Sequence, residues 1–307
     1  FISNVALAGV SITGQSKVGG LVGTSYGAST ISSSYVTGSI SANGWESSVG
    51  GIVGYAWNGG VIADSFSSAD VTGTGVVGGL VGFNQGTITR SHATGTITAT
   101  NYIAGGLVGS NYGTVQFSYA TGVVHAASMM AGGLVGDNTD GRIDYSYSTG
   151  SVTGGDSVGG LVGYMNRAAV LGSYATGSVA GQSSVGGLVG ASANSSHVTQ
   201  SYWDIQTTGI SWGYSYASGT FSATGLTTAQ ATSQASYTSF DFTNTWVSFD
   251  GARPMLRHEY SQGIWNTNQL QLMGLKLGGR YVLTQDIDAR ATGVASSVWG
   301  TSGFSPV

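Results

Sequence analysis

The hydrophobic pattern of this chain is dominated by a short block, Gly-Gly-Leu-Val-Gly or a close variant, that recurs along its first two thirds. The spacing between the hydrophobic third residues of successive blocks is 31, then 28, then 27 residues four times in succession. A near-constant period of this length predicts a repeat protein in which neighbouring units stack. The seven third residues are Leu21, Ile52, Leu80, Leu107, Leu134, Leu161 and Leu188.

Each repeat is predicted to form three short β-strands. In one repeat the apolar segments are 142–145, 151–153 and 158–162, and Gly-rich corners separate them. Helix formers are scarce, whereas Val, Ile, Thr, Tyr and Ser are frequent. A unit this short buries no core alone, so parallel strands of successive units must pair. The pattern predicts an all-β parallel β-solenoid (a β-helix) of about seven ~27-residue coils, and the usual handedness of parallel crossovers predicts a right-handed coil.

A second block, Ser followed by a ring-bearing residue, runs in step with the first. Two residues before these rings lie side chains such as Asp64, Arg90 and Gln200, which share the ring's face if the strand is regular. These side chains are costly in a narrow core, so we expect the rings to point outward and the adjacent Ser and small residues inward. The rings then form either a self-stacking ladder, which we favour, or a surface for sugar rings, another protein or copies of the chain. The column is Tyr35, Phe66, His92, Tyr119, Tyr147, Tyr174 and Tyr202.

The composition narrows the possible partners. Charged residues make up 7% of the chain, and nine scattered Lys and Arg cannot neutralise a run of phosphates, so nucleic-acid binding is not expected. The absence of cysteine excludes disulfides and thiolate metal sites. No stretch approaches ~18 consecutive apolar residues, so no transmembrane helix is predicted.

The candidate chemistry is sparse. Asp137, Asp140 and Asp144 lie close together in the sequence, where they could bind calcium or act as a carboxylate pair on a sugar. The same residues are ordinary turn formers, and we favour that interpretation. The histidines lie in different repeats without metal spacing, and no Gly-x-Ser-x-Gly or His-Glu-x-x-His motif is present. The sequence therefore predicts no catalytic residues and no cofactor. The four histidines are His92, His125, His197 and His258.

The two blocks together resemble a known repeat. Val-Gly-Gly-Leu-Val-Gly at 158–163, with Ser-Tyr-Ala-Thr-Gly at 118–122 and 173–177, resembles the GLUG repeat of filamentous-haemagglutinin-like adhesins and some IgA-protease-type bacterial surface proteins. The resemblance covers residues 1–203. It implies a β-solenoid on an exported protein, located outside the cell at the bacterial surface.

Three segments are expected along the chain. Residues 1–203 are the solenoid, and residues 204–262 resemble the segment that closes such arrays and are expected to form a cap or junction. Within them, Thr227 to Ser236 is predicted to be a short helix with Thr227 or Thr228 as its N-cap. Residues 263–307 resemble the start of a further β-rich unit, so we expect the chain to be a piece of a longer protein.

The favoured function is a non-catalytic structural and adhesive module of a large secreted cell-surface protein. Its partners would be host or bacterial surface glycans, proteins or copies of itself. One alternative is a building block of an extracellular filament or biofilm matrix. Another is a carbohydrate-cleaving β-helix enzyme, which needs clustered charged residues that the sparse charge here does not favour.

Overall fold

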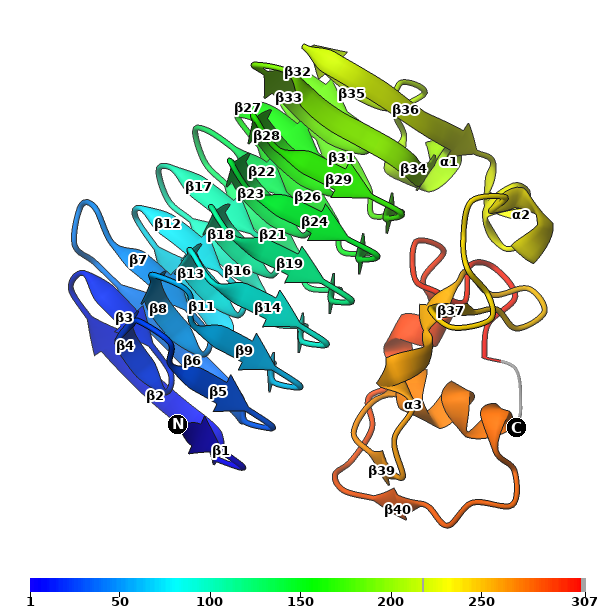
Figure 1. Cartoon of the computed structure of the whole chain (residues 1–307), viewed down its shortest axis with the longest axis horizontal. Helices are drawn as coiled ribbons and strands as arrows, with labels where there is room; N and C mark the ends of the chain where they lie inside the picture. The colour runs from blue at the N-terminus through cyan, green and yellow to red at the C-terminus, as the bar shows by residue number, and fades with distance from the viewer. Residues whose placement is uncertain (217, 305–307) are drawn as a thin grey trace. The chain divides into compact units, whose positions relative to one another are not determined.

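A computed structural model of the chain describes residues 1–216 and 218–304. The chain divides into two compact units, 1–225 and 226–307. Strands make up 48% of the chain and helices 9%, which confirms the all-β prediction. The first unit is a parallel β-solenoid of about eight turns, close to the seven coils expected from the repeats (Figure 1).

One coil shows how the repeat folds. It contains β22 (Ala131–Gly132), β23 (Val135–Thr139), β24 (Arg142–Asp144), β25 (Tyr147–Ser148) and β26 (Val152–Gly154). Each strand pairs in parallel with the equivalent strands of the neighbouring coils, so equivalent residues lie side by side. β22 belongs to a seven-stranded sheet, β23 to an eight-stranded sheet, and the other three to a 21-stranded sheet.

Two of the sheets contain one strand per coil. The other members of the seven-stranded sheet are β3 (Lys17–Gly19), β7 (Ser48–Gly50), β12 (Val76–Gly78), β17 (Ile103–Gly105), β27 (Asp156–Gly159) and β32 (Ser183–Gly186). The other members of the eight-stranded sheet are β4 (Val22–Tyr26), β8 (Val53–Trp57), β13 (Val81–Asn84), β18 (Val108–Asn111), β28 (Val162–Asn166), β33 (Val189–Ala193) and β35 (Tyr214–Tyr216).

The 21-stranded sheet takes up to three strands from each coil. Besides β24, β25 and β26, it contains β1 (Ile2–Ser3), β2 (Ala6–Gly14), β5 (Thr30–Ser32), β6 (Tyr35–Ala42), β9 (Val61–Ala63), β10 (Phe66–Ser67), β11 (Asp70–Gly73), β14 (Thr87–Thr89), β15 (His92–Ala93), β16 (Ile97–Ala99), β19 (Thr114–Gln116), β20 (Tyr119–Ala120), β21 (Val124–Ala126), β29 (Ala169–Leu171), β30 (Tyr174–Ala175), β31 (Val179–Ala180), β34 (Ser196–Asp204) and β36 (Gly219–Leu226).

Repeated apolar residues fill the space between the sheets. The third residue of the glycine block is fully buried from Ile52 to Leu188, and valines of all three sheets join it in one core cluster. Trp203 packs against this cluster from the last coil, and its indole N–H donates to the Ile210 carbonyl at 3.0 Å. The short helix α1 (Ile205–Thr208) follows, with the carboxylate of Asp204 accepting from two backbone N–H groups of its first turn. The first unit thus extends to Gly225, beyond residue 203, where the sequence repeat ends.

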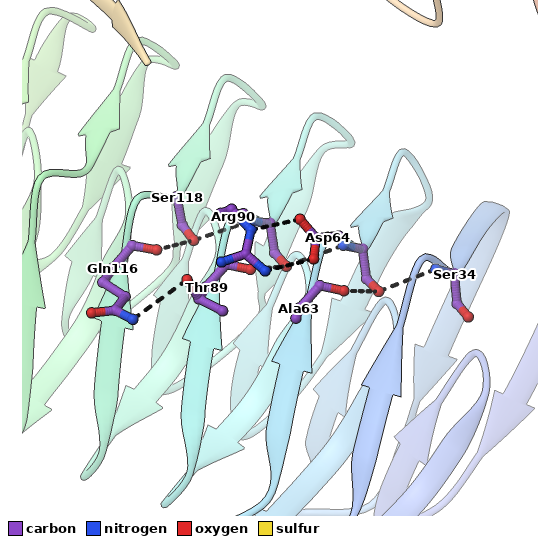
Figure 2. Close-up of polar contacts among 9 residues, drawn as sticks. Ser34, Ala63, Asp64, Thr89, Arg90, Gln116 and Ser118 are labelled. Carbon is purple, nitrogen blue, oxygen red and sulfur yellow. Dashed lines mark hydrogen bonds and ion pairs between the residues drawn. The ribbon is translucent and has the colours of Figure 1, made fainter. Parts of the chain in front are cut away.

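A ladder of buried serines links the coils. The Ser65 backbone N–H donates to the Ser91 hydroxyl at 3.2 Å, and the Ser91 N–H donates to the Ser118 hydroxyl at the same distance (Figure 2). Each hydroxyl in turn donates to a carbonyl two residues earlier in its own coil, as Ser118 does to Gln116 at 2.8 Å. The ladder satisfies buried polar groups at the same corner of every coil. Its members are Ser34, Ser65, Ser91, Ser118, Ser146, Ser173 and Ser201.

We expect Ser118→Ala to lower the free energy of unfolding by about 1–3 kcal/mol, because it removes the acceptor of the buried Ser91 N–H and the donor to the Gln116 carbonyl. Ser39→Ala is the matched control, since Ser39 lies exposed on β6. Urea unfolding followed by circular dichroism measures both variants. Equal stability of the two variants would contradict a stabilising role for the ladder.

The second unit mixes short helices and strands. The start of the predicted helix is confirmed: α2 (Thr228–Ala231) has Thr227 as its N-cap, with a capping box to Gln230. The helix ends at Ala231 instead of continuing to Ser236, and a separate 3₁₀ turn follows. The buried Arg253 guanidinium donates to the carbonyls of Ala295 and Ser297. The remaining elements are the 3₁₀ helices η1 (Gln234–Ser236), η2 (Arg257–Glu259), η3 (Met273–Leu275) and η4 (Arg290–Gly293), the antiparallel pair β37 (Trp246–Val247) and β38 (Met255–Leu256), the parallel pair β39 (Gly263–Ile264) and β40 (Val282–Leu283), and α3 (Thr267–Leu272).

Candidate functional site

The aromatic column forms a continuous ring stack. Phe66 stacks on Tyr35 with centroids 4.9 Å apart, and His92 stacks on Tyr119 with centroids 4.6 Å apart. The interplanar angles from Tyr35 to Tyr174 are between 2° and 6°, and Tyr202 continues the register on β34. The small residues that follow the rings belong to the buried interior, as the alternation predicts. These are Val36, Ser67, Ala93, Ala120, Ser148 and Ala175.

Stacking determines what these rings can bind. Each ring inside the column is covered on one face by the ring before it and on the other by the ring after it. A sugar that packs flat on an aromatic ring needs an open face, which the interior of this stack does not offer. Tyr35, Phe66 and His92 are partly exposed, whereas the four tyrosines from Tyr119 onward are buried. The geometry is that of the self-stacking ladder.

The expectation of a regular strand through the two residues before each ring is wrong. The residues two positions before the rings do not continue a regular strand, because their backbone is left-handed, with φ of 50° at Asp64, 48° at Arg90 and 49° at Phe117. The chain therefore turns a corner just before each ring, and strand alternation does not carry across it. Asp64 and Arg90 lie at this corner and form an ion pair at 2.7 Å between neighbouring coils (Figure 2).

The structure does not bring the three aspartates together as a calcium site. Asp140 pairs with Arg167 at 2.7 Å and Asp144 pairs with Arg142, while Asp137 accepts from the Thr139 hydroxyl at 2.8 Å. Across residues 1–216 and 218–304, no group of three or more His, Asp or Glu side chains is placed to hold a metal ion.

Asp137 is the most perturbed of these acids. It lies on β23 with 8% of its surface exposed, and burial raises the pKa of its carboxyl from 3.8 to about 6. Bonds from Thr139 and Ser110 oppose this shift without cancelling it. Because the folded pKa exceeds the unfolded one, the folded chain binds more protons between these two values. The free energy of unfolding therefore falls as the pH rises through this window and stays lower above it.

Asp137→Asn is expected to remove this penalty. The variant should match the wild type near pH ~4 and exceed its free energy of unfolding by up to about 3 kcal/mol above pH ~6, the equivalent of the pKa difference. Thermal unfolding of both proteins at several pH values in this range measures the difference. A difference that does not change with pH would contradict the assignment to the Asp137 carboxyl.

A second aromatic group lies on the eight-stranded sheet, and the repeat pattern did not reveal it. We call it the sheet patch: Tyr26, Tyr55, Trp57, Phe83 and Tyr112. Tyr55 stacks on Phe83 at 4.5 Å and on Trp57 at 5.7 Å, and Phe83 stacks on Tyr112 at 5.1 Å. The Lys17 ammonium lies 4.3 Å from the centre of the Tyr55 ring.

The sheet patch is open to solvent in its outer part. Tyr26 is 68% exposed, Trp57 41% and Tyr112 39%, whereas Tyr55 and Phe83 are partly buried beneath or beside them. A sequence signal for the exposed rings exists: the residue five positions after the central hydrophobic residue of the glycine block is aromatic in three repeats, as Tyr26, Trp57 and Tyr112. It is Gln85, Thr139, Asn166 and Ala193 in the other four, so the sequence alone shows no continuous column.

Comparison with known families identifies part of the first unit. The GLUG motif matches residues 14–41, 46–72, 73–98 and 127–153. The chain thus contains a GLUG-repeat region, folded as a parallel β-solenoid. A search of curated proteins and a search of solved structures each found no match. Within the described part of the chain, no helix is long and apolar enough to cross a membrane.

Proposed function

We propose that the chain is a non-catalytic structural and adhesive module of a large secreted bacterial cell-surface protein. It would stand outside the cell and attach the surface to other cells or to a matrix. The observation that carries this proposal is a solenoid stabilised by serine and ring ladders that also presents open aromatic side chains on one sheet. The GLUG repeats support it through their resemblance to those of bacterial surface adhesins.

The charge distribution supports contact by apolar and polar groups rather than by charge. Among the described residues of the solenoid, Asp64 pairs with Arg90, Asp140 with Arg167, and Asp144 with Arg142. Because the charges of each pair offset one another, the electrostatic field at the surface around these residues is small, and the chain as a whole has a net charge of only −4. Adhesion through this surface is therefore expected to be insensitive to salt.

Beads coated with the full 307-residue chain test the adhesive role. They should be retained on bacterial or epithelial cell layers more than albumin-coated beads, and retention should persist in roughly 0.5 M NaCl, where charge contacts are screened. Retention no greater than that of albumin-coated beads on any layer would reject the proposal. Retention that disappears in salt would show that charged groups make the contact, contrary to the proposed apolar and polar contacts.

Asp137 favours one alternative, a carbohydrate-cleaving enzyme. A carboxyl with a pKa of about 6 is suited to general acid catalysis. Glycoside cleavage ordinarily needs a second free carboxylate, however, and both neighbouring aspartates are tied to arginines. Release of reducing ends from a neutral polysaccharide, lost in Asp137→Asn, would establish the enzyme in place of the adhesive module.

A further inference from the structure

We propose that the sheet patch is a binding surface for an uncharged polysaccharide chain that runs across successive coils. This inference rests on the proposed adhesive function and names its ligand class and its site. The surface consists of the exposed Tyr26, Trp57 and Tyr112, and Tyr55 and Phe83 stack against Trp57 and Tyr112.

The register places the three exposed rings in one row. Trp57 pairs directly with Tyr26 across β4 and β8. Tyr112 follows Asn111, which pairs with Asn84 and through it with Ala56, the residue before Trp57. Tyr112 is therefore two coils from Trp57 at the same position of the repeat.

The spacing of this row suits a chain of sugar rings. Parallel strands lie about 4.8 Å apart, so Trp57 and Tyr112 are separated by roughly 10 Å along the stack. That distance is comparable to the length of two linked pyranose rings. A polysaccharide aligned with the stack can thus place two sugar rings, with one sugar unit between them, on Trp57 and Tyr112, while Tyr26 extends the aromatic surface by one coil beyond Trp57.

The rings of the sheet patch differ from those of the column in the surface that they leave open. In the column each interior ring is covered on both faces. In the sheet patch Trp57 stacks on Tyr55 and Tyr112 stacks on Phe83, but these two rings still remain 41% and 39% exposed, and Tyr26 is 68% exposed. An exposed, pre-ordered aromatic side chain loses little conformational entropy when a ligand packs on it.

A polar group between the rings matches the hydroxyl rim of a sugar. Gln85 is partly exposed in the row between Trp57 and Tyr112, and its side-chain amide can donate and accept hydrogen bonds. Thr139 follows Tyr112 in the next coil, but it is buried and its hydroxyl already donates to Asp137. The surface therefore places one uncharged polar side chain between two aromatic ones.

The charges near the sheet patch argue for a neutral ligand. Lys17 is engaged with the Tyr55 ring, and Arg167 is paired with Asp140. Recognition of an acidic polysaccharide favours several cations along one line, and this row contains none at its five positions from Tyr26 to Thr139. Burial of Asp137 next to the row likewise disfavours an additional negative charge from the ligand.

Affinity electrophoresis of the full chain tests the proposal with defined probes. Barley β-glucan, galactomannan, xyloglucan and dextran are the neutral polysaccharides, and alginate and polygalacturonate are the acidic ones. We expect retardation by at least one neutral polysaccharide and by neither acidic one. Trp57→Ala should raise the dissociation constant about tenfold or more, as expected for a central aromatic contact. Tyr26→Ala, at the most exposed ring, provides a second variant with little expected effect on folding.

Trp45→Ala is the matched control. Trp45 is 69% exposed and lies between β6 and β7, and its one described ring contact is a perpendicular pair with Tyr102, with the ring centroids 6.1 Å apart. This variant should bind the polysaccharide like the wild type. Retardation by no neutral polysaccharide, or equal losses in Trp45→Ala and Trp57→Ala, would overturn the proposal.

The bead assay separates this inference from the adhesive function. Beads that adhere while no neutral polysaccharide is bound would overturn the sheet patch as a glycan site and leave the adhesive function intact. Polysaccharide binding that depends on Trp57, without adhesion to any cell layer, would support the site and reject the adhesive function. Adhesion lost in Trp57→Ala without glycan binding would assign the surface to a protein partner instead.

Discussion

Replacing Gly132 by alanine is expected to destabilise the solenoid by about 4 kcal/mol or more, at the upper end of single substitutions. An added Cβ would lie 1.9 Å from the Val135 carbonyl oxygen and 2.7 Å from the backbone nitrogen of Gly163 in the next coil. Both obstacles are backbone atoms, so no side chain can rotate away to make room. The coil must open, and the parallel ladders on either side open with it.

Gly27→Ala is the control for this prediction. Nothing lies within 4 Å of a Cβ placed at Gly27, but its φ is +65°, so alanine there should cost only about 1–2 kcal/mol of backbone strain. Urea midpoints and resistance to limited proteolysis measure both variants. A Gly132→Ala protein as stable as Gly27→Ala would mean that the neighbouring coils shift apart freely, contrary to close stacking.

The repeat period predicted the architecture because each coil buries the same kinds of residue at the same positions. A leucine at the centre and a glycine where two backbones meet recur at Leu134 and Gly132 and at their equivalents, so the period is visible in the sequence. The corners were not predictable in the same way. Asp64, Arg90 and Phe117 share a left-handed backbone although their side chains have nothing in common. The buried serine that follows each of these residues stabilises the corner, because its hydroxyl accepts a hydrogen bond from the backbone of the preceding coil. Strand propensity alone does not predict this role of serine.

The candidate site was only half predictable for a related reason. The ring column occurs in every repeat and is therefore visible as a pattern. The sheet patch combines Trp57 and Tyr112 from coils that are not adjacent, with Gln85 between them, and only the strand register shows that they form one row. For the aspartates, closeness in the sequence wrongly suggested a shared site. Asp137 and Asp144 are close in sequence, but they lie on strands of two different sheets.

Leu134→Ala is expected to lower the free energy of unfolding by about 3–5 kcal/mol, the range for a large aliphatic side chain removed from a well-packed core. Leu134 is fully buried, and its equivalents Leu107 and Leu161 in the adjacent coils are fully buried too. Backbone hydrogen bonds hold these coils in place, from the Leu134 N–H to the Leu161 carbonyl at 2.9 Å and from the Leu107 N–H to the Leu134 carbonyl at 2.8 Å. The coils therefore cannot collapse into the space that the side chain leaves, and a cavity remains.

Leu21→Ala tests whether this cost comes from stacking on both sides. Leu21 occupies the same position of the repeat but is only partly buried. Its truncation removes less buried surface and leaves a site open to water, so we expect a cost of about half that of Leu134→Ala. Guanidinium unfolding of the full chain, followed by circular dichroism, compares the two variants. Equal losses of unfolding free energy would show that each leucine stabilises its own coil independently of its neighbours. A smaller loss at Leu21 would show that the stabilisation depends on packing against coils on both sides.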